Sequence, residues 1–228
     1  MGEAGDRQER LLQEQIAYFE ARAPEYDAGM VPDLSDPDAA EWQQLRAKVG
    51  GKTLTGDVVD LAAGTGLWTE LLRDTANSVT LVDASGEALE LARQRLGGEN
   101  VSYVVADLFE WKSDRRHDVV FSSFWLSHVP PDLIPGFVDQ VDSLCRPGGS
   151  VVLVDEHQFD DPGLSVGADD EDPWVSHRTV SDGRRYRLVK VSHDPASVAA
   201  IFQDRGWRTS MDHRGDRFYM LTAESPTP

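Results

Sequence analysis

Residues 56–69 read GDVVDLAAGTGLWT, and this stretch decides the fold. Its opening apolar run is typical of a short buried strand, and we expect a helix over residues 68–75. Between the two, Gly64 and Gly66 allow a tight turn whose backbone N–H groups can approach a ligand closely. In α/β proteins a nucleotide-like ligand binds at such a turn, and hydride-transfer and methyl-transfer enzymes both build it. The stretch alone therefore leaves the ligand open.

The rest of the chain alternates between strand-like and helix-like segments. Helices are expected over residues 132–144 and over residues 85–98, where Ser85 is the N-cap and Gly97 the stop signal. Further strands are expected over residues 78–83, 101–107, 117–124 and 150–156. Strands that alternate with helices of this length predict an α/β fold with a mostly parallel sheet and helices on both of its faces.

Segments at both ends extend this core. Residues 7–22 have the spacing of an amphipathic helix, and a second helix should begin near Asp38. After Asp155 a long acidic run precedes two β-rich runs that flank Asp182 and Gly183, a strong hairpin signal. We divide this single domain into an N-terminal helical lid (1–45), a cofactor-binding core (56–155), a substrate-cap insertion with a hairpin (156–192) and a C-terminal helix with antiparallel strands (193–223).

Composition narrows the possible partners and location. The 40 acidic residues against 22 Lys and Arg give a net charge of −18, which disfavours binding to nucleic acid or to an anionic membrane surface. No apolar run is long enough to span a bilayer, and the polar N-terminus lacks the features of a signal peptide. Cys145 is the only cysteine, so an internal disulfide is impossible and a cytoplasmic location is expected.

The residues around the glycine turn distinguish between cofactors. A dinucleotide-binding turn would carry a third glycine, but Thr69 occupies that position and the bulky Trp68 precedes it. Asp83 ends the second strand 19 residues after Gly64 and is placed to accept hydrogen bonds from both ribose hydroxyls, which fits NAD equally well. Thr69 and Trp68 therefore argue against a dinucleotide, whereas Asp83 does not discriminate between the cofactors.

Two further acidic positions complete the selection. Asp60, at the end of the first strand, can face a positively charged amino group. Asp107, at the end of the third strand, can accept a hydrogen bond from the adenine amine, and the amide of Leu108 can donate to a ring nitrogen. A ligand with one adenosine and a charged amino-acid tail satisfies all three carboxylates, and S-adenosylmethionine is such a ligand.

The sequence resembles the class I S-adenosylmethionine-dependent methyltransferases. Their acidic-x-G-x-G-x-G motif appears as residues 60–66, DLAAGTG, with Ala62 in place of the first glycine, and residues 144–156, LCRPGGSVVLVDE, resemble their lead into strand five. The resemblance implies a Rossmann-like, seven-stranded sheet and S-adenosylmethionine as cofactor, without a metal. It also implies cofactor contacts at Tyr18, Tyr26, Asp60, Ala62, Gly64, Trp68, Asp83, Ala84, Asp107, Leu108 and Phe124.

Residues 18–27, 124–130 and 177–191 resemble a small group of bacterial natural-product O-methyltransferases that act on phosphonates. This resemblance implies that Arg178 and Lys190 hold the anionic group of the acceptor. Tyr26, on the segment expected to fold over the cofactor, and His128, which follows the fourth strand at the ligand crevice, are also expected at the acceptor. Asp33 stands where the group has a tyrosine, and a carboxylate there would repel a phosphonate. The expected substrate is a small anionic metabolite of phosphonate or carboxylate type, and the expected activity is O-methylation in antibiotic biosynthesis.

Several of these residues have a purely structural alternative. His128 follows the fourth strand and is either a general base or a residue that only lines the pocket. Trp68 packs beside the methionine tail or plugs the base of the helix, and Phe19 is expected to pack in the lid. Arg178 opposes Arg187 if the hairpin has a two-residue turn, but a three-residue loop puts it on the face of Tyr186, Leu188 and Lys190. If the resemblance is set aside, the basic residues of the hairpin are interpreted as a solvent-exposed basic strand without a role in binding.

Three other functions compete with the leading one. An N-methyltransferase would use Asp33 to bind an ammonium group. An NAD(P)-dependent oxidoreductase would share Asp83 but lacks the third glycine, and an inactive ligand-binding protein would not need the full set of cofactor acids. The six histidines are too scattered for a zinc site. No motif reports on the oligomeric state or the pathway.

Overall fold

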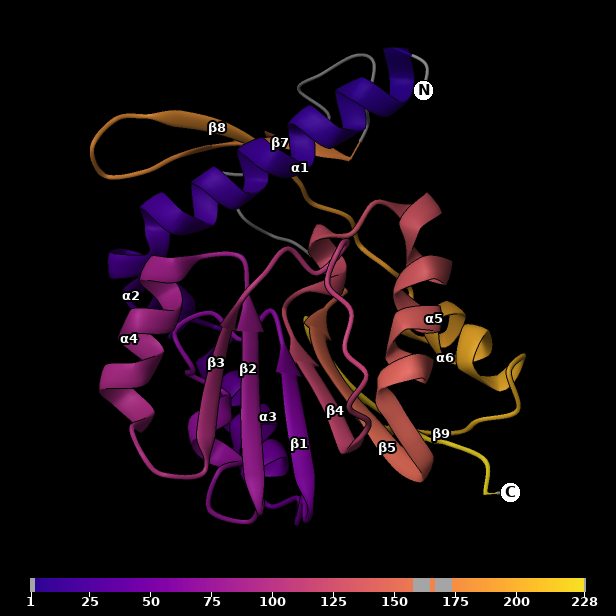
Figure 1. Ribbon diagram of the computed structural model, residues 1–228. Helices are drawn as coiled ribbons and strands as arrows, with labels where there is room; N and C mark the ends of the chain where they lie inside the picture. The colour runs from indigo at the N-terminus through magenta and orange to yellow at the C-terminus, as the bar shows by residue number, and fades with distance from the viewer. Residues whose placement is uncertain (1–2, 158–164, 167–173, 228) are drawn as a thin grey trace.

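The computed structural model describes residues 3–157, 165–166 and 174–227, and its centre is a seven-stranded sheet (Figure 1). The strand order is β3-β2-β1-β4-β5-β10-β9, with neighbours parallel from β3 to β5 and β10 antiparallel to both β5 and β9. The strands are β1 (Asp57–Leu61), β2 (Ser78–Asp83), β3 (Val101–Val105), β4 (His117–Ser123), β5 (Cys145–Glu156), β9 (Arg208–Arg214) and β10 (Phe218–Glu224). This confirms the predicted Rossmann-like fold.

Helices bury both faces of the sheet. On one face lie α3 (Ala39–Gly50) and α4 (Gly86–Leu96), and on the other lie α5 (Ile134–Leu144) and α6 (Pro195–Gln203). Because the central strand is covered on both sides, Val58, Val59 and Leu61 are all fully buried. The Ser85 hydroxyl caps α4 as predicted, since it accepts a hydrogen bond from the Ala88 amide at 3.0 Å. None of the described helices is long and apolar enough to cross a membrane.

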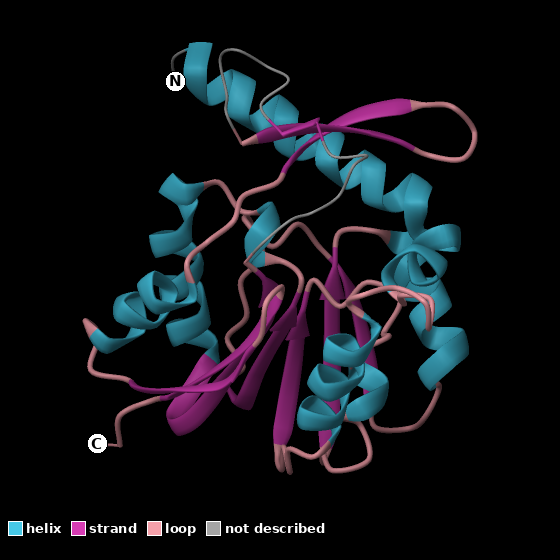
Figure 2. Cartoon of the chain, turned by 180° about the vertical axis from the view of Figure 1, so that it is seen from behind, coloured by secondary structure: helices cyan, strands magenta, loops and turns pink. Residues whose placement is uncertain are grey.

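A separate layer covers the carboxyl ends of the parallel strands. It consists of α1 (Glu3–Arg22), which runs across the sheet edge, and of the hairpin formed by β7 (Val175–Thr179) and β8 (Arg185–Val189), with the short β6 (Ser165–Val166) beside it (Figure 2). Leu11 of α1 packs against Val175 and Val189, and Tyr18 packs against Val180 and Leu188. The helix and the hairpin are therefore packed together. The 3₁₀ turn Ala23–Glu25 and α2 (Tyr26–Met30) lead back to the sheet.

Of the two predicted connections between the hairpin strands, a two-residue turn and a three-residue loop, the structure has the three-residue loop. Arg178 pairs with Tyr186, and the Val180 amide donates to the Arg184 carbonyl at 3.0 Å, which leaves residues 181–183 as the loop. Gly183 has a φ of +89°, a conformation that favours glycine. The loop length thus places Arg178 on the side of the hairpin that Tyr186 and Lys190 share.

The helix expected over residues 68–75 is wrong. The structure has one 3₁₀ turn, Thr69–Leu71, followed by irregular turns. The Thr69 hydroxyl donates to the buried Asp60 carboxylate at 2.5 Å, and the Trp68 ring packs against Trp42 with centroids 5.1 Å apart. These contacts with distant residues fix two neighbouring side chains in a way that local helix propensity does not report.

Gly66 is the turn position least tolerant of a side chain. It has a φ of +73°, and a Cβ there would lie 2.9 Å from Leu96 Cδ1 and 3.2 Å from Ala92 Cβ on α4. We expect Gly66→Ala to lower the free energy of unfolding by about 1–3 kcal/mol, measured by urea denaturation. Gly136→Ala is the control, because Gly136 lies in α5 with no atom within 4 Å of the new Cβ, and it should be neutral or stabilising. Equal losses in the two variants would contradict this account.

Candidate active site

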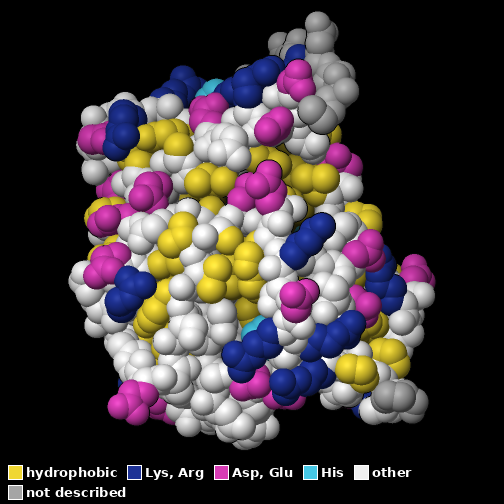
Figure 3. All heavy atoms as spheres, viewed as in Figure 1, with side chains coloured by type: hydrophobic (Ala, Val, Ile, Leu, Met, Phe, Trp, Pro, Cys, Tyr) yellow, Lys and Arg dark blue, Asp and Glu magenta, His cyan; other side chains and the backbone are white. Residues whose placement is uncertain are grey.

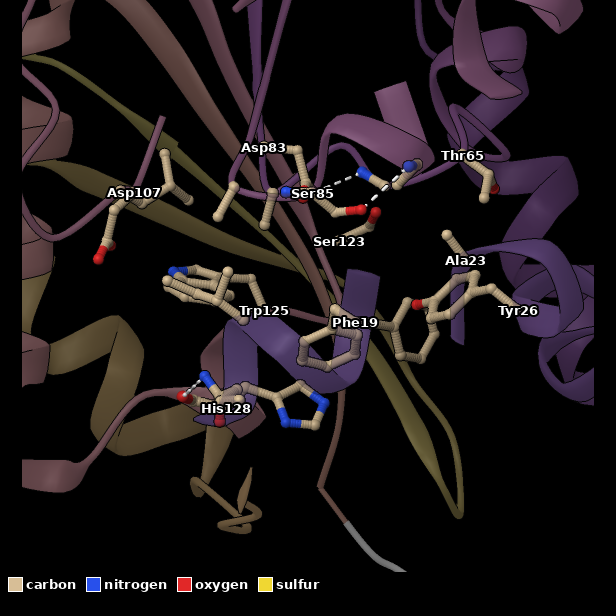
Figure 4. A pocket seen from close by; sticks show the side chains of 18 of the residues that line it. Phe19, Ala23, Tyr26, Thr65, Asp83, Ser85, Asp107, Ser123, Trp125 and His128 are labelled. Carbon is tan, nitrogen blue, oxygen red and sulfur yellow. Dashed lines mark hydrogen bonds between the residues drawn. The ribbon is translucent and has the colours of Figure 1, made fainter. Parts of the chain in front are cut away.

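A cavity of about 770 Å³, open to solvent, lies between the lid layer and the carboxyl ends of the strands. Figure 4 shows Phe19 of α1 and Tyr26 of α2 facing Asp83, which ends β2, and Ser85, which caps α4, with Asp107 and Thr65 toward opposite ends. Apolar side chains also reach the surface below the lid (Figure 3). The predicted cofactor residues that line this cavity are Tyr26, Ala62, Gly64, Asp83, Ala84, Asp107, Leu108 and Phe124.

Asp83 holds the glycine turn and the start of α4 together. Its two carboxylate oxygens accept from the Gly64 amide and from the Ser85 amide, each at 2.8 Å. Burial raises the pKa of Asp83, while these two hydrogen bonds oppose the rise. A carboxylate oxygen can accept more than one hydrogen bond, so both can still receive a ribose hydroxyl. The geometry fits the predicted ribose acid.

Asp60 lies fully buried and does not itself line the cavity. Its Oδ2 accepts from Thr69, whereas Oδ1 is buried without a hydrogen-bond partner in the described part of the chain. Burial, with a smaller contribution from the charge of Asp83, raises the pKa of Asp60 to about 7. A buried acceptor of this kind needs a donor, and a positively charged amino group at the turn would supply it, directly or through one water molecule. The site therefore fits the amino-acid tail of S-adenosylmethionine.

Aromatic side chains line the end of the cavity near Asp107. Phe109 and Trp125 lie with ring centroids 5.4 Å apart, and the Phe109 amide donates to Asp107 Oδ1 at 3.0 Å. Together with Leu108, these side chains offer flat apolar surfaces and a polar edge, which is what an adenine ring requires. Sequence reasoning found Asp107 and Leu108 but missed the two aromatic residues.

A second, more polar cavity adjoins the first. The two share four lining residues, namely Phe19, Tyr26, Phe124 and His128. Four basic side chains line the second cavity, from Arg22, Arg178, Lys190 and Arg217, together with three acidic ones, from Asp36, Asp38 and Glu156. The structure thus brings the predicted acceptor residues Tyr26, His128, Arg178 and Lys190 to one cavity that shares a wall with the cofactor cavity.

Phe124 forms part of this shared wall and has an unusual backbone. It follows β4 with a φ of +54°, in the left-handed region that a bulky residue rarely adopts. Its amide donates to the Val154 carbonyl at 2.7 Å, and its ring packs against Trp68 and Trp42 with centroids 5.5 and 5.7 Å away. The strained backbone directs the ring between the two cavities.

His128 is held as a neutral hydrogen-bond acceptor. Its Nδ1 lies 2.7 Å from the Val189 carbonyl, and because a carbonyl only accepts, Nδ1 carries the proton and Nε2 keeps its lone pair. Burial, with the positive charge of Lys190, lowers the pKa of His128 well below its usual value. Gln15 of the lid fixes this arrangement, since it donates to the His128 carbonyl and accepts from the Val189 amide.

Lys190 belongs to a chain of ion pairs that begins in the protein interior and ends at partly exposed residues. Its ammonium group contacts Glu156 and the Ser127 hydroxyl, and only 6% of the residue is exposed. The other oxygen of Glu156 lies 3.2 Å from Arg217 Nε, and Arg217 also pairs with Asp38. The sequence alone did not predict that Glu156, Arg217 and Asp38 belong to the site. Register provides the reason, because Phe218 of β10 pairs with Glu156 of β5 across the sheet.

Three of the predicted cofactor residues, namely Tyr18, Asp60 and Trp68, do not line the cofactor cavity. Tyr18 is buried against the hairpin and does not line the cofactor cavity, whereas Phe19, expected only to pack, lines both cavities. Tyr18 lines only the second cavity. Trp68 lines neither cavity, and its ring packs among aromatic residues, which supports the plug interpretation. The positions of Tyr18 and Phe19 have one cause. The hairpin, which is distant in sequence, packs against α1 and so determines which side of this helix faces the sheet.

Asp33 does not join the acceptor cavity. It is exposed, its side chain accepts a hydrogen bond from the neighbouring Leu34 amide at 3.0 Å, and it lines neither cavity. The structure therefore does not bring Asp33 together with the other predicted acceptor residues, nor does it place Asp33 where it could bind an ammonium group in this cavity. Arg184 and Arg185 are exposed, in agreement with their solvated interpretation. Among the described residues, no cluster of His, Cys, Asp and Glu could hold a metal ion.

The raised pKa of Asp60 predicts a pH-dependent stability difference. Its folded pKa of about 7 exceeds the ordinary 3.8, so its contribution to stability is present at low pH and is lost as the pH rises toward 7. Asp60→Asn cannot ionise. Its free energy of unfolding, relative to the unsubstituted protein, should therefore rise by about 2–3 kcal/mol between pH 5 and pH 8. Urea denaturation at both pH values measures this, and parallel pH profiles would refute the assignment.

Comparisons with known proteins agree with this geometry. Residues 58–149 match a protein family described as a methyltransferase domain. The structure of DhpI in complex with S-adenosylhomocysteine is 38% identical, covers 96% of this chain and 98% of its own, and superposes with a TM-score of 0.77. A complex of DhpI with S-adenosylmethionine and HEP matches equally well, with a TM-score of 0.77 at 38% identity over 93% of this chain and 97% of its own.

Curated relatives match a shorter region. Demethylmenaquinone methyltransferase of Tropheryma whipplei is 30% identical over 121 residues, which is 53% of this chain and 50% of the relative. Trans-aconitate 2-methyltransferase of Azoarcus sp. is 31% identical over 123 residues, 52% of this chain and 46% of the relative. The chain thus spans about half the length of these curated relatives. Its match to DhpI extends over nearly the whole of both chains, and the chain belongs to the class I S-adenosylmethionine-dependent methyltransferases.

Proposed function

We propose that the chain transfers a methyl group from S-adenosylmethionine to an oxygen of a small anionic metabolite, of phosphonate or carboxylate type, in natural-product biosynthesis. The observation that carries the proposal is the pair of adjoining cavities. One has the acids and aromatic residues that suit the cofactor, and the other is lined by four basic side chains. Trans-aconitate, the acceptor in the name of one relative, is itself a carboxylate.

Each cavity has a distinct part in this reaction. S-adenosylmethionine supplies an electrophilic methyl group on a sulfonium centre. Asp83 and Asp107 would hold the ribose and the adenine in the first cavity, which shares a wall with the acceptor cavity. In-line transfer then requires the acceptor oxygen to be held close to the methyl group with water excluded, and the lid residues Phe19 and Tyr26 supply that cover.

The role of His128 depends on the acceptor. Its neutral Nε2 can accept the proton of a hydroxyl or acid group as the oxygen attacks, as a general base does. An acceptor that is already an oxyanion needs no base, and His128 would then orient it only through contact. With Asp33 outside the cavity, the N-methylation alternative has lost the residue on which it rested. The proposal also includes a cytoplasmic location and no nucleic-acid or membrane partner, supported by the net charge of −18.

The cofactor part of the proposal is tested at Asp83. Asp83→Asn leaves one acceptor oxygen in place of two, and we expect it to weaken binding of S-adenosylhomocysteine by about 1.5–3 kcal/mol, because hydrogen bonds to a charged group are lost. Isothermal titration calorimetry measures the affinity. Asp33→Asn is the matched control, since the exposed Asp33 lines neither cavity and its variant should bind as the unsubstituted protein does. Unchanged affinity in a folded Asp83→Asn variant would exclude the ribose assignment.

The acceptor part is tested by a screen. Purified protein is incubated with S-adenosylmethionine and with phosphonates, carboxylates or amines, and methylated products are identified by mass spectrometry. With the best acceptor, Arg178→Ala should raise KM at least tenfold and leave S-adenosylhomocysteine affinity unchanged, since a charged hydrogen bond to the acceptor is lost (about 1.5–3 kcal/mol). Arg184→Ala, at the exposed hairpin loop, should change neither. Methylation of amines alone would overturn the proposal.

A further inference from the structure

The basic side chains of the acceptor cavity differ in their partners. Lys190 and Arg217 both pair with Glu156, and Arg217 pairs with Asp38 as well. These two positive charges therefore have counter-ions within the protein. An acceptor that approaches either of them meets a carboxylate alongside the cation, so they contribute less to the attraction of an anion than their number indicates.

Arg22 has no such counter-ion among the residues that the structure describes. Its Nη1 donates to the Tyr18 hydroxyl at 2.5 Å, and its guanidinium carbon lies 5.8 Å from the ring centroids of both Tyr18 and Tyr26. Its Nε is buried and has no hydrogen-bond partner, and no carboxylate of residues 3–157, 165–166 or 174–227 lies at ion-pair distance from it. The guanidinium nonetheless lines the acceptor cavity.

A partly buried guanidinium with an unused donor is unfavourable unless an acceptor satisfies it, and an anionic group is the strongest such acceptor. The two tyrosine rings offset only part of the lost hydration, because a cation–π contact is worth about 0.5–2 kcal/mol. The guanidinium presents its donors in a flat fork that matches two oxygens of a phosphonate or a carboxylate. Within the cavity, the missing partner has the chemistry of such an anionic group.

We propose that Arg22 binds the anionic group of the acceptor and thereby couples acceptor binding to the lid. The inference rests on the proposed function. Arg22 is the last residue of α1, and two other residues of that helix already contact the reaction site. Phe19 lines both cavities, and Gln15 donates to the carbonyl of His128. An anion held by Arg22 therefore fixes the helix that covers the cofactor and positions His128.

The test compares Arg22→Gln with Arg10→Gln, which makes the same change of charge at an exposed position of the same helix. Ethylphosphonate and propionate are titrated calorimetrically into each protein saturated with S-adenosylhomocysteine. We expect Arg22→Gln to weaken binding of the anion at least tenfold, while S-adenosylhomocysteine affinity stays within twofold of the unsubstituted protein. Arg22→Lys, which keeps the charge but not the planar fork, should recover part of the loss.

Hydrogen exchange provides a readout that a merely structural role would not change. The anion should slow amide exchange over residues 12–30 in the unsubstituted protein and in Arg10→Gln, but not in Arg22→Gln. Equal affinity for the anion in all three proteins would overturn the role of Arg22 while the proposed function stands. If the unsubstituted protein binds S-adenosylhomocysteine but neither anion, the anionic acceptor itself is refuted, and the role of Arg22 with it.

Discussion

The cofactor cavity depends on one carboxylate that receives two backbone N–H groups. Asp83 ends β2, and its oxygens accept from Gly64 on the turn after β1 and from Ser85 at the start of α4. Two chain segments that leave neighbouring strands are thus held at a fixed separation, and a ligand can rest on their backbone. The same carboxylate is the predicted ribose contact, so cofactor recognition and local architecture use the same side chain.

In the layer formed by α1 and the hairpin, two neighbouring residues of α1 each make more than one contact. Gln15 links α1 to His128 and to β8, and Glu14 accepts from the Arg187 amide at 2.7 Å and pairs with the Arg187 side chain at 2.9 Å. The helix α1 and the hairpin are therefore joined by side-chain hydrogen bonds and an ion pair in addition to their apolar packing. The residues of the acceptor cavity come from this layer, from residues 26–42 and from the β10 end of the sheet, whereas the acids of the cofactor cavity follow the parallel strands.

Much of the fold could be predicted because its signals are local. The strand-turn pattern and the acids at strand ends located Asp83 and Asp107, since parallel strands bring their carboxyl ends to one edge. Arg217 could not be found this way, because its place beside Glu156 comes from the pairing of β10 with β5. The choice between Tyr18 and Phe19 likewise depends on the hairpin, and Thr69 leaves the helical pattern because it bonds to Asp60.

Phe124, whose backbone is left-handed, contributes its ring to the wall between the cofactor cavity and the acceptor cavity. A non-glycine residue in this conformation costs about 1–2 kcal/mol, and only glycine would remove that cost. Glycine would also remove one of the side chains that both linings share, and only Phe19, Tyr26 and His128 would then remain between the two cavities. Relief of the backbone and separation of the reactants are therefore incompatible at this position. A strained residue thus forms part of the wall that determines where donor and acceptor can meet.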